Sequence, residues 1–271
     1  MHAAFRGAKL RAGRKPAVSG KAVDAGLPLI GLARERRILL GALRKRESWL
    51  VLGPAGSGKT ALVKCALESA PPSGALVYVA GFQSLHELLL EIARGLLQCG
   101  HQRFRRLAGA GANPERWLSG QTSLHLRGLL WEAFEAEPAT VVLDGVNGAG
   151  HSTYRFLQRL YMAPNMALIA LARNVSRLGE LGRLFWDPGR TLHLQPLTEA
   201  EAGRLFETAA AAFGLQGPGL EVFREKVLES AAGNPGQIVE MCRLAVKPEY
   251  VSGNYIKFAL VRIDAKMRYL D

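Results

Sequence analysis

One short segment constrains the fold of this chain more than any other. Residues 53–60 read Gly-Pro-Ala-Gly-Ser-Gly-Lys-Thr, which satisfies the pattern G-x-x-x-x-G-K-[ST]. An apolar run at residues 49–52, typical of a buried strand, precedes this segment, and residues 61–67 are typical of a helix. Strand, glycine-rich loop and helix therefore follow one another in the order that a phosphate-binding loop requires.

The residue types in this loop explain why it would bind phosphate. Glycines tolerate positive φ and close approach, so successive backbone N–H groups can point at phosphate oxygens, and the following helix adds the positive end of its dipole. We expect Lys59 to reach the β- and γ-phosphates and Thr60 to place its hydroxyl on Mg²⁺. The residues expected to contact the nucleotide are Gly53, Pro54, Ala55, Gly56, Ser57, Gly58, Lys59, Thr60 and Ala61.

A second element of a phosphate site lies further along the chain. Residues 139–144 form an apolar run rich in β-branched residues, and the run ends in Asp144. A carboxylate at the end of such a strand can hold the magnesium ion opposite Thr60, usually through its water shell. Thr60 and Asp144 are therefore the predicted metal-binding pair.

The charge of the chain indicates polyanionic partners. The formal net charge is +12, and residues 1–21 contain no acidic residue. The basic residues of that segment are Arg6, Lys9, Arg11, Arg14, Lys15 and Lys21, and a second cluster places Arg103, Arg105 and Arg106 around Phe104. This pattern fits an arm that contacts nucleic acid. The alternatives are a solvated tail or an arginine-rich targeting segment.

Other features of the composition narrow the class of protein. No apolar stretch approaches the roughly 20 residues needed to cross a bilayer, and no apolar core of a secretory signal opens the chain. Cys65, Cys99 and Cys242 are far apart, so neither a disulfide framework nor a zinc site is indicated. We therefore expect a globular protein of the reducing cytoplasm, without a membrane partner.

Apolar runs alternate with helical sequence over residues 28–195, which is typical of a parallel sheet covered on both faces. The predicted strands are 48–53, 75–80, 139–144, 166–171 and 190–194, and the predicted helices are 32–46, 60–70, 84–98, 122–136 and 152–161. Residues 99–120 are rich in glycine, and we expect them to be irregular. The sequence therefore predicts an α/β fold with a five-stranded parallel sheet.

The pattern changes after residue 195. Thr198 and Glu201 form a capping box, which opens the first of three predicted helices at 198–213, 219–231 and 236–246. The predicted organisation is a basic tail at 1–27, a core at 28–195, a three-helix lid at 196–247 and a C-terminal basic helix or tail at 248–271. This last segment has apolar residues at helical spacing, which could pack on the lid or dock a partner.

These features together resemble AAA+ ATPases and the related STAND NTPases, nearest to origin-recognition-type loaders and transposition-helper ATPases. The resemblance spans roughly residues 28–247 and is carried by residues 31–35, 53–60, 141–144, 171–174, 194–201 and 233–235. It implies a P-loop NTPase sheet of order 5-1-4-3-2, with a small helical lid that closes over ATP and Mg²⁺. It also implies that Arg173, after the fourth strand, senses the γ-phosphate, and that Pro235 contacts the nucleotide.

Two departures from the family pattern concern hydrolysis. Gly145 follows Asp144 where most AAA+ ATPases have a glutamate that orients the attacking water, and Gln237 replaces a lid arginine that many relatives have. A missing cation at the γ-phosphate can cost on the order of 10³-fold in rate. We therefore expect an ATPase that hydrolyses slowly.

Several further residues are candidates for supporting roles. Asn147 and His151 could contact the attacking water, although a residue at the entry of a helix is the simpler interpretation of His151. The candidates for an arginine finger that reaches a neighbouring subunit are Arg155, Arg159, Arg183 and Arg190. Trp49 and Trp131 follow strand and helix periodicity, so we expect both in the core.

Three functions are consistent with these features. The first is an ATPase that acts as a nucleotide-dependent assembly switch on or near DNA, with ATP and ADP as ligands, nucleic acid bound through the basic tail, and further copies as subunits of a homo-oligomer. The second is a signalling or scaffold protein whose nucleotide controls protein partners only. The third, a small-molecule kinase, is disfavoured because the lid has few arginines.

The predicted loop leads to a direct test with the variant Lys59→Ala. We expect this variant to lose ATP binding while it keeps its fold, because the ammonium supplies charge to the phosphates and not to the core. Titration with labelled ATP and Mg²⁺ measures the first effect, and circular dichroism measures the second. Binding equal to that of the parent would mean that the site is wrongly placed.

Overall fold

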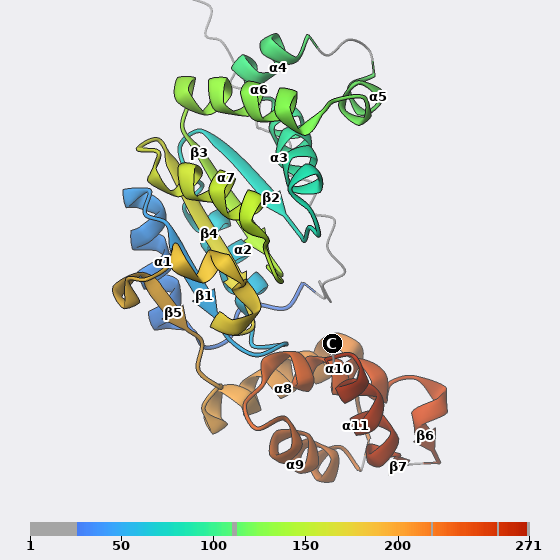
Figure 1. Cartoon of the computed structure of the whole chain (residues 1–271). Coiled ribbons are helices and arrows are strands. Elements are labelled where there is room, and N and C mark those ends of the chain that lie inside the picture. The colour runs from blue at the N-terminus through green and yellow to red at the C-terminus, as the bar shows by residue number, and fades with distance from the viewer. Residues whose placement is uncertain (1–25, 110–112, 218, 254, 270–271) are drawn as a thin grey trace, which may run out of the picture.

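A five-stranded parallel sheet forms the centre of the computed structural model, which describes residues 26–109, 113–217, 219–253 and 255–269 (Figure 1). Its strands are β1 (Trp49–Leu52), β2 (Ala75–Val79), β3 (Ala139–Asp144), β4 (Met166–Ala172) and β5 (Thr191–His193). They lie in the order β2-β3-β4-β1-β5, and every pairing is parallel. Read from its other edge, this is the predicted order 5-1-4-3-2. The predicted basic tail falls almost entirely on residues 1–25, which lie outside the described residues.

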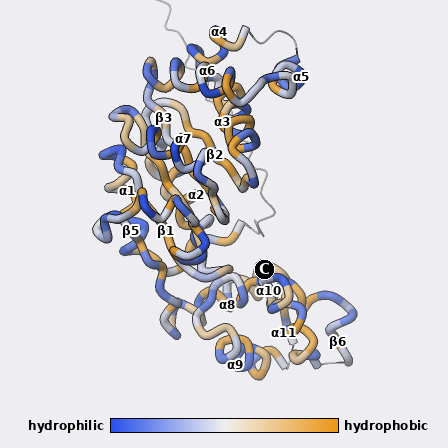
Figure 2. Tube along the Cα trace, viewed as in Figure 1, coloured by the Kyte–Doolittle hydropathy of each residue, from blue (hydrophilic) through white to orange (hydrophobic). Residues whose placement is uncertain are grey.

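Helices cover both faces of the sheet, as the continuous apolar strands predicted. One face carries α1 (Ala33–Lys45) and α2 (Lys59–Ser69), and the other carries α3 (Leu85–Cys99), α6 (Ser123–Ala136) and α7 (His151–Met162). Successive side chains of a strand point to opposite faces, so Val141 joins the core below α3 and α6, while Val142 joins the core below α1 and α2. Figure 2 shows the hydrophobic residues concentrated along these strands.

The expectation that residues 99–120 are irregular is wrong. This segment forms two short helices, α4 (Gln102–Ala108) and α5 (Pro114–Ser119). His101 caps α4 by accepting a hydrogen bond from the Phe104 N–H, and Asn113 caps α5 in the same way. Phe104 and Leu118 anchor the two helices in the main core. The glycines of this stretch end helices and do not prevent them, because Gly109 and Gly120 are C-caps.

The lid contains the three predicted helices, α8 (Glu199–Phe213), α9 (Leu220–Ala231) and α10 (Pro235–Ala245). Thr198 and Glu201 form both hydrogen bonds of the capping box. The C-terminal segment also belongs to this unit: it adds a hairpin of β6 (Val251–Ser252) and β7 (Tyr255–Ile256), followed by α11 (Phe258–Met267). Val261 and Ala265 of α11 lie in the core that α8, α9 and α10 share. The last segment therefore packs on the lid, and the lid is larger than three helices.

The remaining predictions about individual residues have mixed outcomes. Trp131 is buried and contacts Phe134 and Phe156 in the main core, as expected. Trp49 is only half-buried, and its indole N–H donates to Glu47. The three cysteines are free thiols. Within the described ranges, the helices are all too short or too polar to span a membrane.

The packing of α11 leads to a test of its place in the lid. Val261 is fully buried and Ile263 is 52% exposed on the same helix. We expect Val261→Ala to lower the free energy of unfolding by about 2 kcal/mol, because it removes buried methyl groups. The matched control, Ile263→Ala, should change it by less than about 0.5 kcal/mol. Urea unfolding measures both, and equal effects would contradict the packing.

Candidate nucleotide-binding site

The predicted phosphate loop joins β1 to α2 in the geometry of an anion site. Gly56 and Gly58 have φ values of 78° and 90°, a region that residues with a Cβ rarely adopt. Helix α2 begins at Lys59, so the N–H groups of Lys59, Thr60 and Ala61 have no acceptor within the helix. These groups and the helix dipole point at the mouth of the loop, where they can bind phosphate oxygens.

Lys59 lies folded back over this loop. Its Nζ donates to the carbonyl oxygens of Gly53 and Pro54, at 2.7 Å and 2.9 Å, and lies 3.5 Å from the Ser57 hydroxyl. Burial lowers the pKa of Lys59 to about 8; the Asp144 carboxylate opposes this shift, and the positive charge of Arg173 adds to it. The ammonium thus contacts neutral acceptors, which an anionic phosphate can replace.

The two predicted metal-binding residues are hydrogen-bonded to each other. Thr60 Oγ1 donates to Asp144 Oδ2 at 2.7 Å, although the two residues come from α2 and from the end of β3. The sheet order places β4 between β1 and β3, which brings both strand ends to one edge. A hydroxyl and a carboxylate are hard oxygen ligands, so this pair fits Mg²⁺.

Sequence reasoning missed a third member of this cluster, Tyr78 of β2. Its hydroxyl donates to the same Asp144 oxygen that Thr60 contacts. Burial raises the pKa of Tyr78, and the nearby Asp144 charge raises it further, so the phenol stays a hydrogen-bond donor. Tyr78 pairs with Val142 in register, two residues before Asp144 on the neighbouring strand. In the sequence, the one sign of this role is that Tyr78 is a polar residue near the end of a predicted strand.

The lid contacts the phosphate loop directly. Asn234 Nδ2 donates to the carbonyl oxygen of Ala55 at 2.9 Å, and the Gly236 N–H donates to the carbonyl oxygen of Gly56 at 2.8 Å. The backbones are so close that a Cβ on Gly236 would lie 2.6 Å from the Gly56 Cα. Pro235 lies between these two contacts, next to Gly58.

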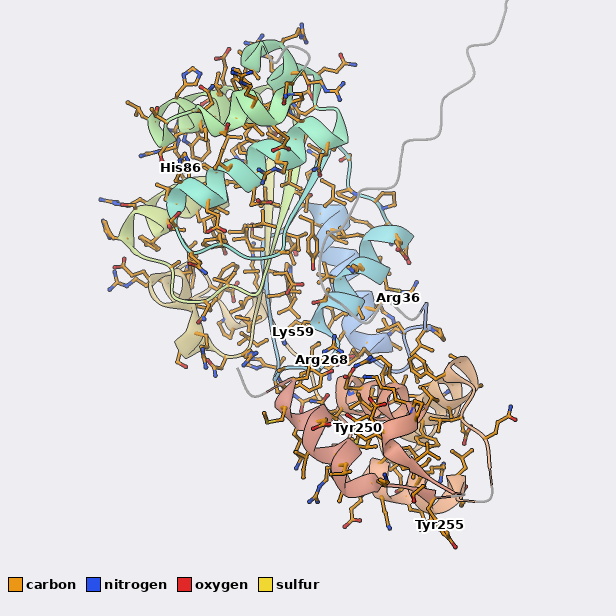
Figure 3. The ribbon with its side chains drawn as sticks, turned by 90° about the vertical axis from the view of Figure 1, so that its right-hand side faces the viewer. Arg36, Lys59, His86, Tyr250, Tyr255 and Arg268 are labelled. Atoms are coloured by element: carbon orange, nitrogen blue, oxygen red, sulfur yellow. The ribbon has the colours of Figure 1, made fainter. Side chains whose placement is uncertain are left out.

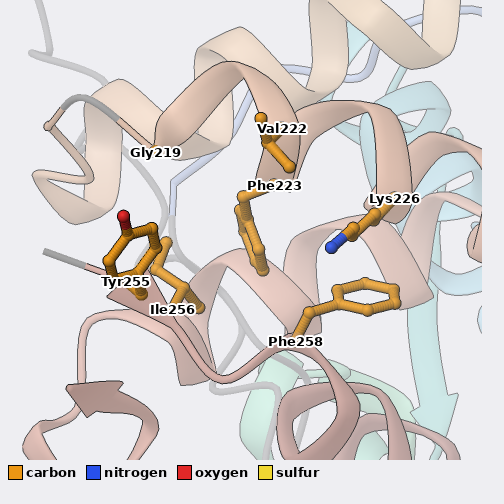
Figure 4. A pocket seen from close by; sticks show the side chains of 7 residues that line it. All are labelled: Gly219, Val222, Phe223, Lys226, Tyr255, Ile256 and Phe258. Carbon is orange, nitrogen blue, oxygen red and sulfur yellow. The ribbon is translucent and has the colours of Figure 1, made fainter.

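A hollow of about 290 Å³ opens between the loop and the lid. Its walls include Pro54 and Ser57 of the loop and Pro235, Gln237 and Lys266 of the lid. A second hollow, of about 300 Å³, lies within the lid between α9 and β7 (Figure 4). Its walls are mostly apolar, and none of the predicted site residues lines it. The first hollow is therefore the one that can hold part of a nucleotide.

Arg173 lies just beyond β4, at the sheet edge where Asp144 also ends its strand. Its side chain is exposed, and its charge acts on Lys59. The core thus contributes a second cation whose charge acts on Lys59. Its role as a sensor of the γ-phosphate stays a prediction.

The backbone explains why glycine follows Asp144. Gly145 has φ of 73°, a conformation in which a glutamate would be strained. The N–H of the next residue, Val146, donates to the Leu171 carbonyl oxygen at 3.2 Å and fixes this turn against β4. The absence of the usual glutamate is therefore built into the main chain at this point.

Most of the other candidates have partners elsewhere. His151 begins α7 and lies 3.1 Å from Glu180, so the helix-entry interpretation fits its position. Three of the four candidate finger arginines pair with carboxylates: Arg159 with Glu135, Arg183 with Glu180 and Arg190 with Asp187. Arg155 is exposed on α7 and forms no ion pair within the described part of the chain.

The sheet order, the loop and the Thr60–Asp144 pair together define a phosphate-loop nucleotide-binding protein. Residues 28–176, more than half of the chain, match the AAA ATPase domain family, and the chain belongs to this family. Its members are ATPases that bind ATP with Mg²⁺. No curated protein matches the sequence.

Solved structures with the same fold include proteins of the origin-recognition type. Cdc6p of Pyrobaculum aerophilum has a TM-score of 0.57 and 17% identity, over 85% of this chain and 63% of that one. The Orc1 protein of Aeropyrum pernix, solved in complex with DNA, has a TM-score of 0.57 and 16% identity, over 89% of this chain and 66% of that one. A Walker-type ATPase of Pyrococcus abyssi has a TM-score of 0.55 and 18% identity, over 89% of this chain and 72% of that one. The chain thus spans less than two thirds of the Cdc6p and Orc1 chains. The predicted AAA+ fold is confirmed.

The lowered pKa of Lys59 leads to a pH test of the site. Because this pKa is about 8 in the free protein and phosphate favours the charged ammonium, binding takes up a proton above that pH. We expect ATP affinity to fall by up to about tenfold per pH unit above about pH 8 and to be nearly constant just below it. Titration calorimetry in buffers of different ionisation enthalpy measures the uptake. The control, Lys59→Arg, stays charged and should show no such slope; a flat profile in the parent would contradict the assignment.

Proposed function

We propose that this protein binds and slowly hydrolyses ATP with Mg²⁺ and acts as a nucleotide-dependent assembly switch on or near DNA. The observation that carries this proposal is the arrangement of Lys59, Thr60 and Asp144 around a loop to which the lid is hydrogen-bonded. A site of this kind changes its contacts with both the core and the lid when a triphosphate enters.

Each residue has a defined part in the proposed reaction. The N–H groups of the loop bind the phosphate oxygens, and Lys59 leaves the Gly53 and Pro54 carbonyls to contact the β- and γ-phosphates. Thr60 and Asp144 hold Mg²⁺, which neutralises charge on the phosphate oxygens when bound. Tyr78 keeps the Asp144 carboxylate oriented toward Thr60. Arg173 supplies positive charge at the γ-phosphate.

The residues around this site support slow hydrolysis. The main chain at Gly145 disfavours a glutamate, and Gln237 provides no charge on the lid helix. Water is then poorly oriented and one cation is missing, which can cost on the order of 10³-fold in rate. The protein therefore spends most of each cycle in its ATP-bound form.

The switch depends on the contact between loop and lid. Asn234 and Gly236 bind the carbonyl oxygens of Ala55 and Gly56, which lie on the loop that wraps the phosphates. Any shift of these peptides on ATP binding moves the lid as a unit, because its helices share one core. The lid position in turn decides which surface is offered to a neighbouring copy, which is the differential contact that a switch requires.

Two observations support DNA as a partner of this protein. The net charge of +12 and the basic segment at residues 1–21 attract polyanions, and Orc1, which shares the fold, was solved with DNA. The second basic cluster contributes less than its sequence indicates, because Phe104 is buried and Arg103 pairs with Glu132. A nucleotide-controlled scaffold with protein partners only is the alternative, and Gly145 favours it. For both of these functions we propose that the protein acts in the cytoplasm.

Mass measurement tests the switch. We expect the mass of the protein in solution to rise when a non-hydrolysable ATP analogue and Mg²⁺ are added, because the closed lid completes an interface. The Lys59→Ala variant is the control and should keep the mass of the free protein. An unchanged mass of the parent at saturating analogue would contradict the assembly role.

A salt titration on duplex DNA separates the two alternatives. If the basic tail binds DNA, affinity falls steeply as salt rises, and deletion of residues 1–25 removes most of it. Absent binding at low salt, or binding unchanged by the deletion, would favour the scaffold.

A further inference from the structure

The end of the C-terminal helix lies against the phosphate loop. A Cβ on Gly56 would lie 3.2 Å from Cε1 of Tyr269, and a Cβ on Gly236 would lie 2.8 Å from the Tyr269 hydroxyl oxygen. Figure 1 shows this end of the chain beside α10, at the junction between the core and the lid. A segment outside the matched family region therefore reaches the centre of the nucleotide site.

An ion pair with a buried carboxylate holds this segment in place. Glu240 of α10 has a side chain only 3% exposed, and Arg268 Nη1 lies 2.7 Å from its Oε2. Burial by itself raises the pKa of Glu240, but Arg243 and Arg268 together hold it below its usual range, so the carboxylate stays charged. The pair holds the C-terminal end of α11 on α10, and in Figure 3 Arg268 lies at the end of the lid that faces the core.

Lys266 lies two residues before Arg268 and lines the hollow between loop and lid. It is the one charged residue among the described residues that line this hollow. Lys266 is exposed and forms no ion pair with any described residue. Its ammonium is therefore available to a ligand that enters the hollow.

The hollow adjoins the place where the phosphates would lie. Pro54 and Ser57 form part of its wall, and both are residues that the Lys59 ammonium contacts within the loop. Gln237, on the lid side of the same wall, is uncharged. A polyphosphate that met Lys59 from one side would thus meet Lys266 from the other.

We propose that Lys266 is a nucleotide-binding residue that contacts the polyphosphate of ATP from the C-terminal helix. This inference rests on the proposed function, because it assumes that a nucleoside triphosphate occupies the loop. Lys266 then supplies the lid-side cation that Gln237 lacks, and it ties α11 to the presence of the nucleotide. Arg268 acts as a positioning residue, since it fixes the turn that presents Lys266.

The test compares single variants of the full chain by competition with a fluorescent ATP analogue. We expect Lys266→Ala to weaken ATP binding about tenfold, as loss of one charge-assisted hydrogen bond would. Binding of AMP should change by less than about twofold, because AMP lacks the polyphosphate. Lys266→Arg should restore ATP binding. The matched control is Arg262→Ala on the same helix, an exposed cation away from the hollow, which should bind ATP as the parent does.

Three outcomes would overturn the inference. They are unchanged ATP binding by Lys266→Ala, an equal loss for AMP and ATP, and failure of Lys266→Arg to restore binding. The equal loss would indicate that Lys266 only supports the lid. If the parent chain binds no ATP, both the proposed function and this inference are overturned. If the parent binds ATP and Lys266→Ala binds it equally well, only the inference is overturned.

Discussion

The hydrogen bond between Thr60 and Asp144 is the interaction on which the rest of the site depends. It joins the start of α2 to the end of β3 across the intervening strand β4, and the order of the parallel sheet brings the two together. The buried, continuously apolar strands β3 and β4 make that order stable, because helices must cover both of their faces. The chemistry of the site is in this sense a result of the packing of the core.

Electrostatics prepare the same site for an anion. Lys59 is partly buried and rests on two backbone carbonyls, so it gains more from a phosphate than an exposed lysine would. Arg173 lies on the core side and Lys266 on the lid side, and both leave positive charge uncompensated near the loop. A negatively charged ligand between the lid and the core is therefore attracted by both.

Local patterns were enough to predict the loop, the five strands and the three helices of the lid. The signals missed were of two kinds. Tyr78 becomes part of the site through the pairing of β2 with β3, and α11 reaches the loop through its packing in the lid core and its ion pair with α10. Both are contacts between segments far apart in sequence, which periodicity cannot reveal. The helices α4 and α5 were missed for a different reason. The glycines around them were interpreted as helix breakers, although His101 and Asn113 are N-caps that indicate the start of a helix.

The turn at Gly145 sets a limit on how this enzyme can change. Faster turnover would ordinarily be gained by exchanging one side chain for a carboxylate, but here the peptide geometry itself stands in the way. An evolving or engineered descendant would first have to reshape the main chain between β3 and α7. The slow hydrolysis proposed above would then be a property of the main chain and not of one exchangeable side chain.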